Sequence, residues 1–379
     1  MCPWLEADML TAPWSGARAS VELVAVNQPS HQDSASRKGV TTVSVVVVNW
    51  NGGDLVLECL RSVTGQSRPP DEILVVDNAS ADGSPDRIAA EFPSVRLIRN
   101  EKNLGFGGGV NLGARQAAGE WIALLNSDAI ADARWVEEML RAASGREHCG
   151  MVACKIYLDR AFRVLDKVGH RIALDGQNFG RGHGGADDGR FDALTEVAWP
   201  DGCASLWRRE VFERVGGVDE EFFAYADDAD LGIRFRLAGY RCALAPAAVV
   251  EHRHSQSLGA YSPEKLFLVE RNRIWLAMKY FPWTLVVANP FLWAWRAWLT
   301  MRGSRDRSGP WARVPSQDRS AATQAILRAQ VAGWLGLASQ MRKRRELGRL
   351  CGADWRARVR EILSGDRVSL ADLARGDVD

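Results

Sequence analysis

The sequence predicts an α/β fold in which helices flank a mostly parallel central sheet. Three short apolar runs support this prediction, at residues 43–48, 73–76 and 121–125. Each run has the length of a strand and stops abruptly at Asn, Asp, Ser or Gly. Continuous apolar runs are typical of parallel strands that are buried on both faces. Stretches with helical spacing lie between the runs, so the pattern indicates a repeated βαβ unit.

Residues 41–262 are expected to form one domain, preceded by a disordered leader at 1–40 that mixes Pro, Ser, Asp and Arg without a sustained period. The first half of the domain alternates strands with helices. The expected strands are 43–48, 72–76, 95–99 and 121–125, and the expected helices are 54–63, 84–92 and 107–118.

The second half of the domain changes character after residue 128. We expect Asp132 to cap a helix that ends at Ala143. A strand at 151–157, a hairpin at 160–174, a mobile glycine-rich loop at 176–189, a helix at 227–238 and two short strands at 242–244 and 248–250 should follow.

A helical, tryptophan-rich extension is predicted after the domain. Ser262 and Pro263 mark the start of a helix towards Tyr280. Residues 263–301 are amphipathic, but Pro290 and Arg296 interrupt them, so a complete membrane span is not expected. Tryptophan beside arginine suits a lipid interface, and a helix pair packed on the domain fits equally well. Residues 302–379 should form a basic helical extension.

Composition excludes several classes of protein. The 48 Lys+Arg residues nearly balance the 47 Asp+Glu residues, so we expect no attraction to nucleic acid. The seven cysteines lack C-x-x-C spacing, which predicts reduced, packed thiols rather than a disulfide framework or a zinc site. No basic segment followed by an apolar core opens the chain, so we expect a cytoplasmic protein without a signal peptide.

Polar side chains end the three apolar runs and are expected to line one crevice. They are Asn49, then Asp77 and Asn78, then Asn126 and Asp128. Ligands of parallel sheets bind beyond the carboxyl ends of the strands. Asp77 can accept hydrogen bonds from a nucleobase or a ribose, or it can form a plain Asx-turn. Asp128 can hold a divalent metal ion, or it can simply cap a turn.

Three other motifs carry polar or flexible residues. The glycine run that begins at Gly105 suits close approach of an anion, although a tight turn explains it equally well. Asp227, Asp228 and Asp230 open a helix, where acidic residues are favourable; crowding should also raise at least one pKa, as a general base needs. His252 follows a strand and is a metal ligand, a base or a surface residue.

In this order, the motifs resemble those of the inverting, family-two glycosyltransferases of the GT-A fold. The similarity is to the branch with bacterial rhamnosyltransferases and galactofuranosyltransferases. The motifs are VVVVNWNG (45–52), ILVVDNASADGS (73–84), NEKNLGFGGGVNLG (100–113), LLNSDA (124–129), RREVFERVGGVDEEFFAYADDADLGIRFRLAGY (208–240) and VVEHRHSQS (249–257). Together they cover roughly residues 43–257, so the resemblance implies a GT-A catalytic domain at 41–262.

The resemblance implies a nucleotide-sugar site. Asn49 and Asp77 match positions that bind the base and the ribose, and we assign Asn78, Gly105 and Asn126 to the same site. The implied donor is dTDP-rhamnose or a UDP-sugar. The implied acceptor is a hydroxyl of a glycan or of a lipid-linked oligosaccharide in polysaccharide biosynthesis, which would place the protein at the inner face of the cell membrane.

The resemblance also implies a metal ion and a catalytic base. Asp128 matches the last position of the family's D-x-D-like motif, which binds Mg²⁺ or Mn²⁺, and His252 matches a histidine that completes the metal shell. Asn126 replaces the first acidic residue, which weakens metal affinity. Asp228 matches the base that deprotonates the acceptor, with Asp227 and Asp230 in support.

Two other functions are compatible with parts of the sequence. A catalytically silent module that binds a sugar nucleotide or a glycan is favoured by Asn126. An NAD-dependent oxidoreductase is suggested by the glycine run, but G-x-G-x-x-G does not follow the first strand, where Asn49-Trp50-Asn51-Gly52-Gly53 stands instead.

Overall fold

The computed structural model describes residues 41–161, 163–253, 262–305, 318–350, 354–365 and 367–375. The predicted leader, 1–40, lies outside the described residues, as does the end of the last motif, 254–257.

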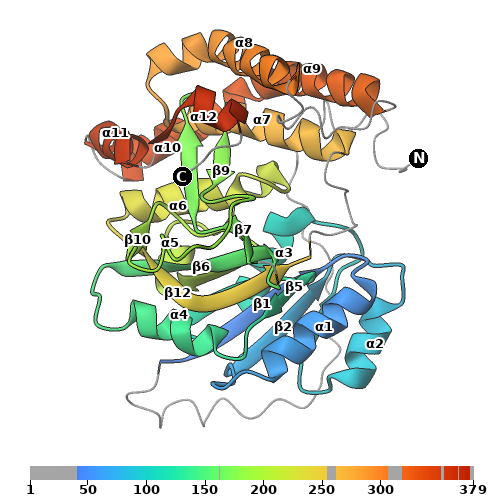
Figure 1. Cartoon of the computed structure of the whole chain (residues 1–379). Helices are drawn as coiled ribbons and strands as arrows, with labels where there is room; N and C mark the ends of the chain where they lie inside the picture. The colour runs from blue at the N-terminus through green and yellow to red at the C-terminus, as the bar shows by residue number, and fades with distance from the viewer. Residues whose placement is uncertain are drawn as a thin grey trace.

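One ten-stranded sheet forms the centre of the molecule (Figure 1). Its main path runs β10-β12-β6-β11-β4-β1-β2-β3, with β5 paired to β12 and β7 paired to β6. Strands β3, β2, β1 and β4 are parallel neighbours, and β11 is antiparallel between β4 and β6. The strands are β1 (Val43–Asn49), β2 (Glu72–Asp77), β3 (Arg96–Arg99), β4 (Trp121–Asn126), β5 (Ala129–Ala131), β6 (Cys149–Asp159), β7 (Val164–Lys167), β10 (Glu196–Val197), β11 (Ala204–Arg208) and β12 (Arg241–His252).

Helices cover both faces of this sheet, which explains the continuous valine run of β1. Val45 and Val47 belong to the core under α1, α2 and α4, whereas Val46 belongs to the core under α3, α5 and α6. All three valines are buried, which confirms the prediction of a strand enclosed on both faces. The helices are α1 (Gly53–Thr64), α2 (Ser84–Glu91), α3 (Gly105–Gln116), α4 (Trp135–Ala143), α5 (Arg209–Arg214) and α6 (Asp227–Leu237).

A small second sheet replaces the predicted hairpin at 160–174. Strand β8 (His170–Ala173) does not pair with β7 but lies between β9 (Asn178–Gly180) and β13 (Arg367–Val368). The hairpin prediction was therefore wrong, and part of the predicted glycine-rich loop is strand β9. Gly169 separates β7 from β8 at φ +73°, a conformation that lets the chain leave the large sheet.

Two further differences and one agreement are local. The two predicted strands at 242–250 form one strand, β12, whose pairing register shifts between Ala245 and Val249. Pro246 lies in that gap and has no N–H to donate to the sheet. Helix α4 begins at Trp135 without a side-chain cap, so Asp132 precedes the helix rather than capping it. The five described cysteines are buried free thiols, as predicted.

The C-terminal part of the chain is helical, as predicted, and lies at the end of the molecule away from α1, α2 and α4 (Figure 1). Ser262 accepts a hydrogen bond from the Lys265 N–H and caps the first of these helices. The helices are α7 (Pro263–Tyr280), α8 (Trp283–Arg305), α9 (Arg319–Leu335), α10 (Leu337–Leu350), α11 (Trp355–Gly365) and α12 (Leu370–Arg375). Within the described ranges, no helix has both the length and the apolar character needed to cross a bilayer.

Candidate active site

The polar ends of β1, β2 and β4 meet at one edge of the large sheet, as predicted. In the parallel register, Asn49 stands opposite Asp77, and Val48 stands opposite Asn126. Because β1 is the central strand of the three, its end lies between the other two. The carboxyl edge of the sheet therefore presents a row of amide and carboxylate groups.

Asn49 and Asp77 form a buried hydrogen-bonded pair. The Asn49 amide nitrogen donates to Asp77 Oδ1 at 2.8 Å and to the Ser84 hydroxyl at 2.9 Å. Asp77 also accepts from the Ser80 backbone N–H and hydroxyl. Among the described residues, no donor reaches the buried Asn49 Oδ1. An unsatisfied acceptor at this edge suits an N–H of a ligand, such as the imide of a pyrimidine base.

Asn78 and Gly105 hold the start of α3 in place. The Asn78 amide donates to the Gly105 carbonyl at 2.9 Å, and its Oδ1 accepts from the Asn100 amide at 2.8 Å. Gly105 has φ +74°, and a Cβ there would lie 2.6 Å from the Phe223 ring and from its carbonyl oxygen. Both residues thus fix the glycine-rich turn against the segment before α6, and a direct contact with the donor stays a prediction.

Asp128 and His252 come together because β5 pairs with β12. Ala129 stands opposite His252 in this antiparallel ladder, which places His252 Nε2 3.4 Å from Asp128 Oδ1. The other ring nitrogen, Nδ1, lies 3.1 Å from Asp166 Oδ2. Burial disfavours the charged imidazole, but Cys203, Asp128 and Asp166 outweigh it and raise the pKa of His252 well above its usual value.

These groups fit a hard divalent cation. A carboxylate and an imidazole that point at each other can share one ion, and the carboxylate on the second ring nitrogen is the usual orienting partner of a metal-bound histidine. Asp128 and His252 would be the ligands, and Asp166 would orient the ring.

Besides the backbone N–H of the next residue, Ala229, at 2.7 Å, three donors from other parts of the chain hold the Asp228 carboxylate at the start of α6. They are the Asn178 amide at 3.2 Å, the Gly202 backbone N–H at 3.3 Å and His170 Nε2 at 3.2 Å. The neighbouring Asp227 is more deeply buried, and burial together with the Asp228 charge raises the pKa of Asp227 to about 8. The predicted pKa elevation thus falls on Asp227, while Asp228 keeps partial exposure.

His170 also contacts a second carboxylate, Asp201, at 2.8 Å. Burial acts to lower the pKa of His170, but Asp228 and Asp201 outweigh it and raise the pKa to about 9. Ligand atoms of His170, Asp201 and Asp228 lie within 4.8 Å of one another, a spacing that could also hold an ion. However, Lys167 Nζ is 2.6 Å from Asp201, so two cationic groups already neutralise this cluster. A metal ion on Asp128 and His252 stays a prediction.

The turn before α6 has an unusual backbone. Phe223, Tyr225 and Ala226 all have φ between 62° and 68°. Asn272 of α7 stabilises the turn, because its amide lies 2.7–3.0 Å from the carbonyl oxygens of Phe222, Ala224 and Tyr225. Helix α7 therefore helps to position the first turn of α6, where Asp227 and Asp228 lie.

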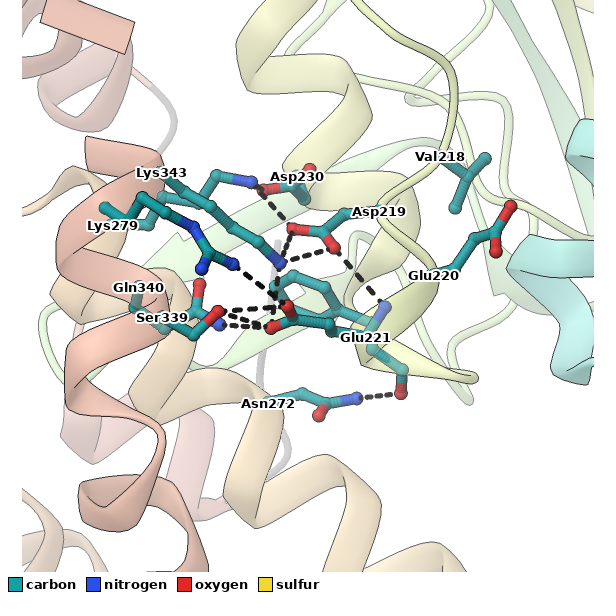
Figure 2. A network of polar contacts seen from close by, with 12 residues as sticks. Val218, Asp219, Glu220, Glu221, Asp230, Asn272, Lys279, Ser339, Gln340 and Lys343 are labelled. Carbon is teal, nitrogen blue, oxygen red and sulfur yellow. Dashed lines mark hydrogen bonds and ion pairs between the residues drawn. The ribbon is translucent and has the colours of Figure 1, made fainter. Parts of the chain in front are cut away.

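Asp230 points away from the Asp228 cluster. Its carboxylate pairs with Lys279 at 2.5 Å (Figure 2) and with Arg234 at 2.7 Å. Burial would raise the pKa of Asp230, but Lys279 and Arg234 lower it well below the usual range. Asp230 thus connects α6 to α7.

Sequence reasoning missed four residues of this site: Asp166, His170, Asn178 and Asp201. Asp166, His170 and Asn178 lie in the segment that was interpreted as a hairpin and a mobile loop, and Asp201 lies just before β11. The available signal was the density of His and Asp between residues 164 and 201, a stretch that has no regular apolar period.

Comparisons with known proteins agree with this architecture. The family model described as glycosyl transferase family 2 matches residues 44–216. The chain is 29% identical over 286 residues to the N-acetylglucosaminyl-diphospho-decaprenol L-rhamnosyltransferase of Mycobacterium tuberculosis, covering 68% of this chain and 90% of that protein. It is 28% identical over 276 residues to the O-antigen biosynthesis protein RfbC of Myxococcus xanthus, covering 67% of this chain and 20% of that protein.

A solved structure shares the fold. The structure of GalNAc-T7 with UDP, GalNAc and Mn²⁺ superposes with a TM-score of 0.51 at 15% identity, covering 64% of this chain and 49% of that one. At this identity the likeness concerns the fold alone.

Proposed function

Because residues 44–216 are a glycosyl transferase family 2 domain and the chain is a glycosyltransferase of the GT-A fold, we propose that it transfers a sugar from a nucleotide-diphosphate donor with inversion of the anomeric centre. We assign the catalytic domain to residues 41–262. The observation that carries the proposal is the meeting of two groups at the carboxyl edge of the sheet: the Asp128 and His252 pair, and the Asp228 carboxylate.

Short contacts connect these two groups. The Asn126 N–H, at the end of β4, donates to the Cys203 carbonyl, and the adjoining Gly202 N–H donates to Asp228. Lys167 lies 2.6 Å from Asp201 and 3.8 Å from Asp166, so it stands between the partners of His170 and of His252. A sugar held by its diphosphate at Asp128 would then lie near the base.

We assign a separate role in the reaction to each group of residues. A divalent ion on Asp128 and His252 would neutralise the leaving diphosphate. Asp228 takes the proton of the acceptor hydroxyl as the new bond to the anomeric carbon forms and the bond to the diphosphate breaks on the opposite face. The Asn178 amide and the Gly202 N–H fix the orientation of the Asp228 carboxylate. Asn49 and Asp77 bind the nucleoside.

The donor and acceptor are proposed from chemistry and from relatives. We propose dTDP-rhamnose or a UDP-sugar as donor, since the mycobacterial relative is named for L-rhamnosyl transfer. That name also specifies a diphospho-decaprenol acceptor, and the Myxococcus relative is named for O-antigen biosynthesis. A lipid-linked glycan is therefore the proposed acceptor, with the enzyme acting peripherally at the inner face of the membrane.

A thermal-shift panel tests the proposed donor site. UDP, dTDP, GDP, CMP and NADH are each added with Mn²⁺ or with EDTA, and the melting temperature is compared with that of the protein alone. We expect UDP or dTDP to stabilise the protein only with Mn²⁺, and we expect Asp128→Ala to remove the effect of Mn²⁺.

Each other result has a distinct meaning. Stabilisation by NADH alone would contradict the proposal and favour an oxidoreductase. Stabilisation by UDP or dTDP without any transfer to a glycan acceptor would favour the silent sugar-nucleotide module. A transferred sugar whose anomeric configuration is retained, measured by proton NMR of the product, would contradict the inverting mechanism.

A further inference from the structure

Helix α8 buries polar side chains and exposes several large apolar ones. Arg296 is turned inward, with Nε 2.6 Å from Asp175 and a terminal nitrogen 2.7 Å from Glu270. Asn289 is also buried and accepts from Arg273 at 2.8 Å. The exposed side chains recur every three or four residues and form one stripe: Trp283, Val287, Phe291, Trp295, Trp298 and Met301. Helices of water-soluble proteins show the opposite pattern.

Helix α9 repeats this pattern. It packs against α7 through small residues, and a Cβ at Gly333 would lie 2.6 Å from Ile274. The other small residues that it buries are Ala322, Ala325 and Ala329. Its exposed side chains, Leu327, Val331 and Leu335, are spaced by four residues, and Val331 is 62% exposed. The two stripes together are called the apolar end surface below.

The charged side chains of α8 and α9 are all positive. Neither α8 nor α9 contains Asp or Glu, whereas Arg302, Arg319 and Arg328 are exposed. The Arg302 guanidinium lies over the Trp298 ring at 4.5 Å, and Trp298 stacks on Trp295 at 5.0 Å between ring centroids. Tryptophan with arginine is typical of residues that lie at the boundary between lipid headgroups and acyl chains.

We propose that the apolar end surface binds to a lipid bilayer that carries anionic headgroups. Figure 1 shows α8 and α9 at the same end of the molecule. Large side chains such as Phe291, which is 78% exposed, would enter the acyl boundary, and the arginines would meet the headgroups. A second copy of the chain is a poorer occupant, because it would bring two arginine-bearing faces without acidic residues together.

Vesicle flotation with the full-length chain tests this surface without any nucleotide sugar, so its outcome is separate from that of the proposed reaction. We expect binding to vesicles of phosphatidylcholine with phosphatidylglycerol, and weaker binding to phosphatidylcholine alone or at high salt. The triple variant Phe291→Gln, Trp295→Gln, Val331→Gln should bind roughly tenfold more weakly, because it removes apolar area from the interface.

A matched variant keeps the positions apolar. Phe291→Leu, Trp295→Phe, Val331→Leu should bind like the wild-type protein, and exposed side chains leave the melting temperature of both variants close to that of the wild type. Absence of vesicle binding by the wild-type protein, or equal binding by the Gln variant, would overturn the proposal. So would a dimer in sedimentation velocity that the Gln variant dissociates while vesicle binding is absent.

Discussion

At the scale of single residues, the orientation of the Asp228 carboxylate depends on hydrogen-bond donors from separate parts of the chain. Asn178 comes from β9, His170 from β8 and Gly202 from the turn before β11, and all three reach Asp228. A carboxylate held from several directions loses little orientation freedom when a substrate binds. The adjacent Asp227, with a pKa of about 8, keeps its proton at neutral pH and so adds no second negative charge.

Replacing Asp228 should separate catalysis from binding. We expect Asp228→Asn to lower kcat by about 10²–10⁴-fold, the usual contribution of a general base. The amide still accepts from the Gly202 N–H, so nucleotide-dependent stabilisation with Mn²⁺ should persist. Radiolabelled sugar transfer and thermal shift measure the two effects. Near-normal turnover would exclude Asp228 as the base, and loss of nucleotide binding would make it a binding residue.

His170 should make stability depend on pH in a defined window. Its pKa of about 9 in the folded protein exceeds the ordinary value of 6.5, so the folded state binds the proton more tightly than the unfolded state. The contribution of His170 to the free energy of unfolding is complete below pH 6.5 and is lost as the pH rises through 9. It is on the order of 3 kcal/mol.

The matched variant for this prediction is His170→Gln. The difference in unfolding free energy between the wild-type protein and the variant should shrink from pH 6.5 towards pH 9, as measured by urea denaturation at several pH values. A difference that stays constant over this range would mean that the imidazole is neutral in the folded protein.

At the scale of elements, helix α10 is attached to the short 3-10 helix η4 (Glu220–Phe222), which precedes the turn into α6. Figure 2 shows the network. Lys343 lies 2.6 and 2.7 Å from the two oxygens of Asp219 and 2.9 Å from Glu221, and Ser339 also donates to Glu221. Lys279 of α7 reaches Asp219 from another direction at 3.0 Å. The C-terminal extension thus contacts the segment that leads to the proposed base.

Lys343 and its neighbour Arg342 form a matched pair for testing this network. Lys343→Met should lower the free energy of unfolding by about 1–3 kcal/mol, because it removes charged hydrogen bonds from a mostly buried carboxylate. Arg342→Met should change it by less than about 0.5 kcal/mol, since the Arg342 side chain is 66% exposed and 3.9 Å from Glu221. Chemical denaturation of both variants measures this. Equal losses would mean that the network contributes no more than a surface ion pair.

At the scale of the whole molecule, local patterns made most of the first half predictable. The valine run of β1 and the polar residues at its end follow from burial on both faces and from the parallel register, and both are visible in the sequence. His170 and Asn178 were not predictable in the same way. Their strands are short, and one partner strand of β8 is β13, so no local period marks the small sheet.

The C-terminal extension is therefore part of the architecture around the site. Val368 of β13 is buried against Ala173 of β8, and the Arg171 guanidinium donates to the Arg367 carbonyl. The strand that carries His170 is supported on one side by β9 and on the other by β13. Sequence motifs end near residue 257, but contacts that shape the site continue to residue 368.

The pairing of β13 with β8 has a consequence for protein synthesis. Arg171 and its partner Arg367 are 196 positions apart in the chain. A ribosome adds roughly 5–20 residues per second, and domains fold as they emerge. The large sheet is complete once β12 has been made. Strand β8, which carries His170, gains its second neighbour only after β13 has been made. The nascent chain thus passes through a period in which the large sheet is complete and β8 still lacks its second neighbour.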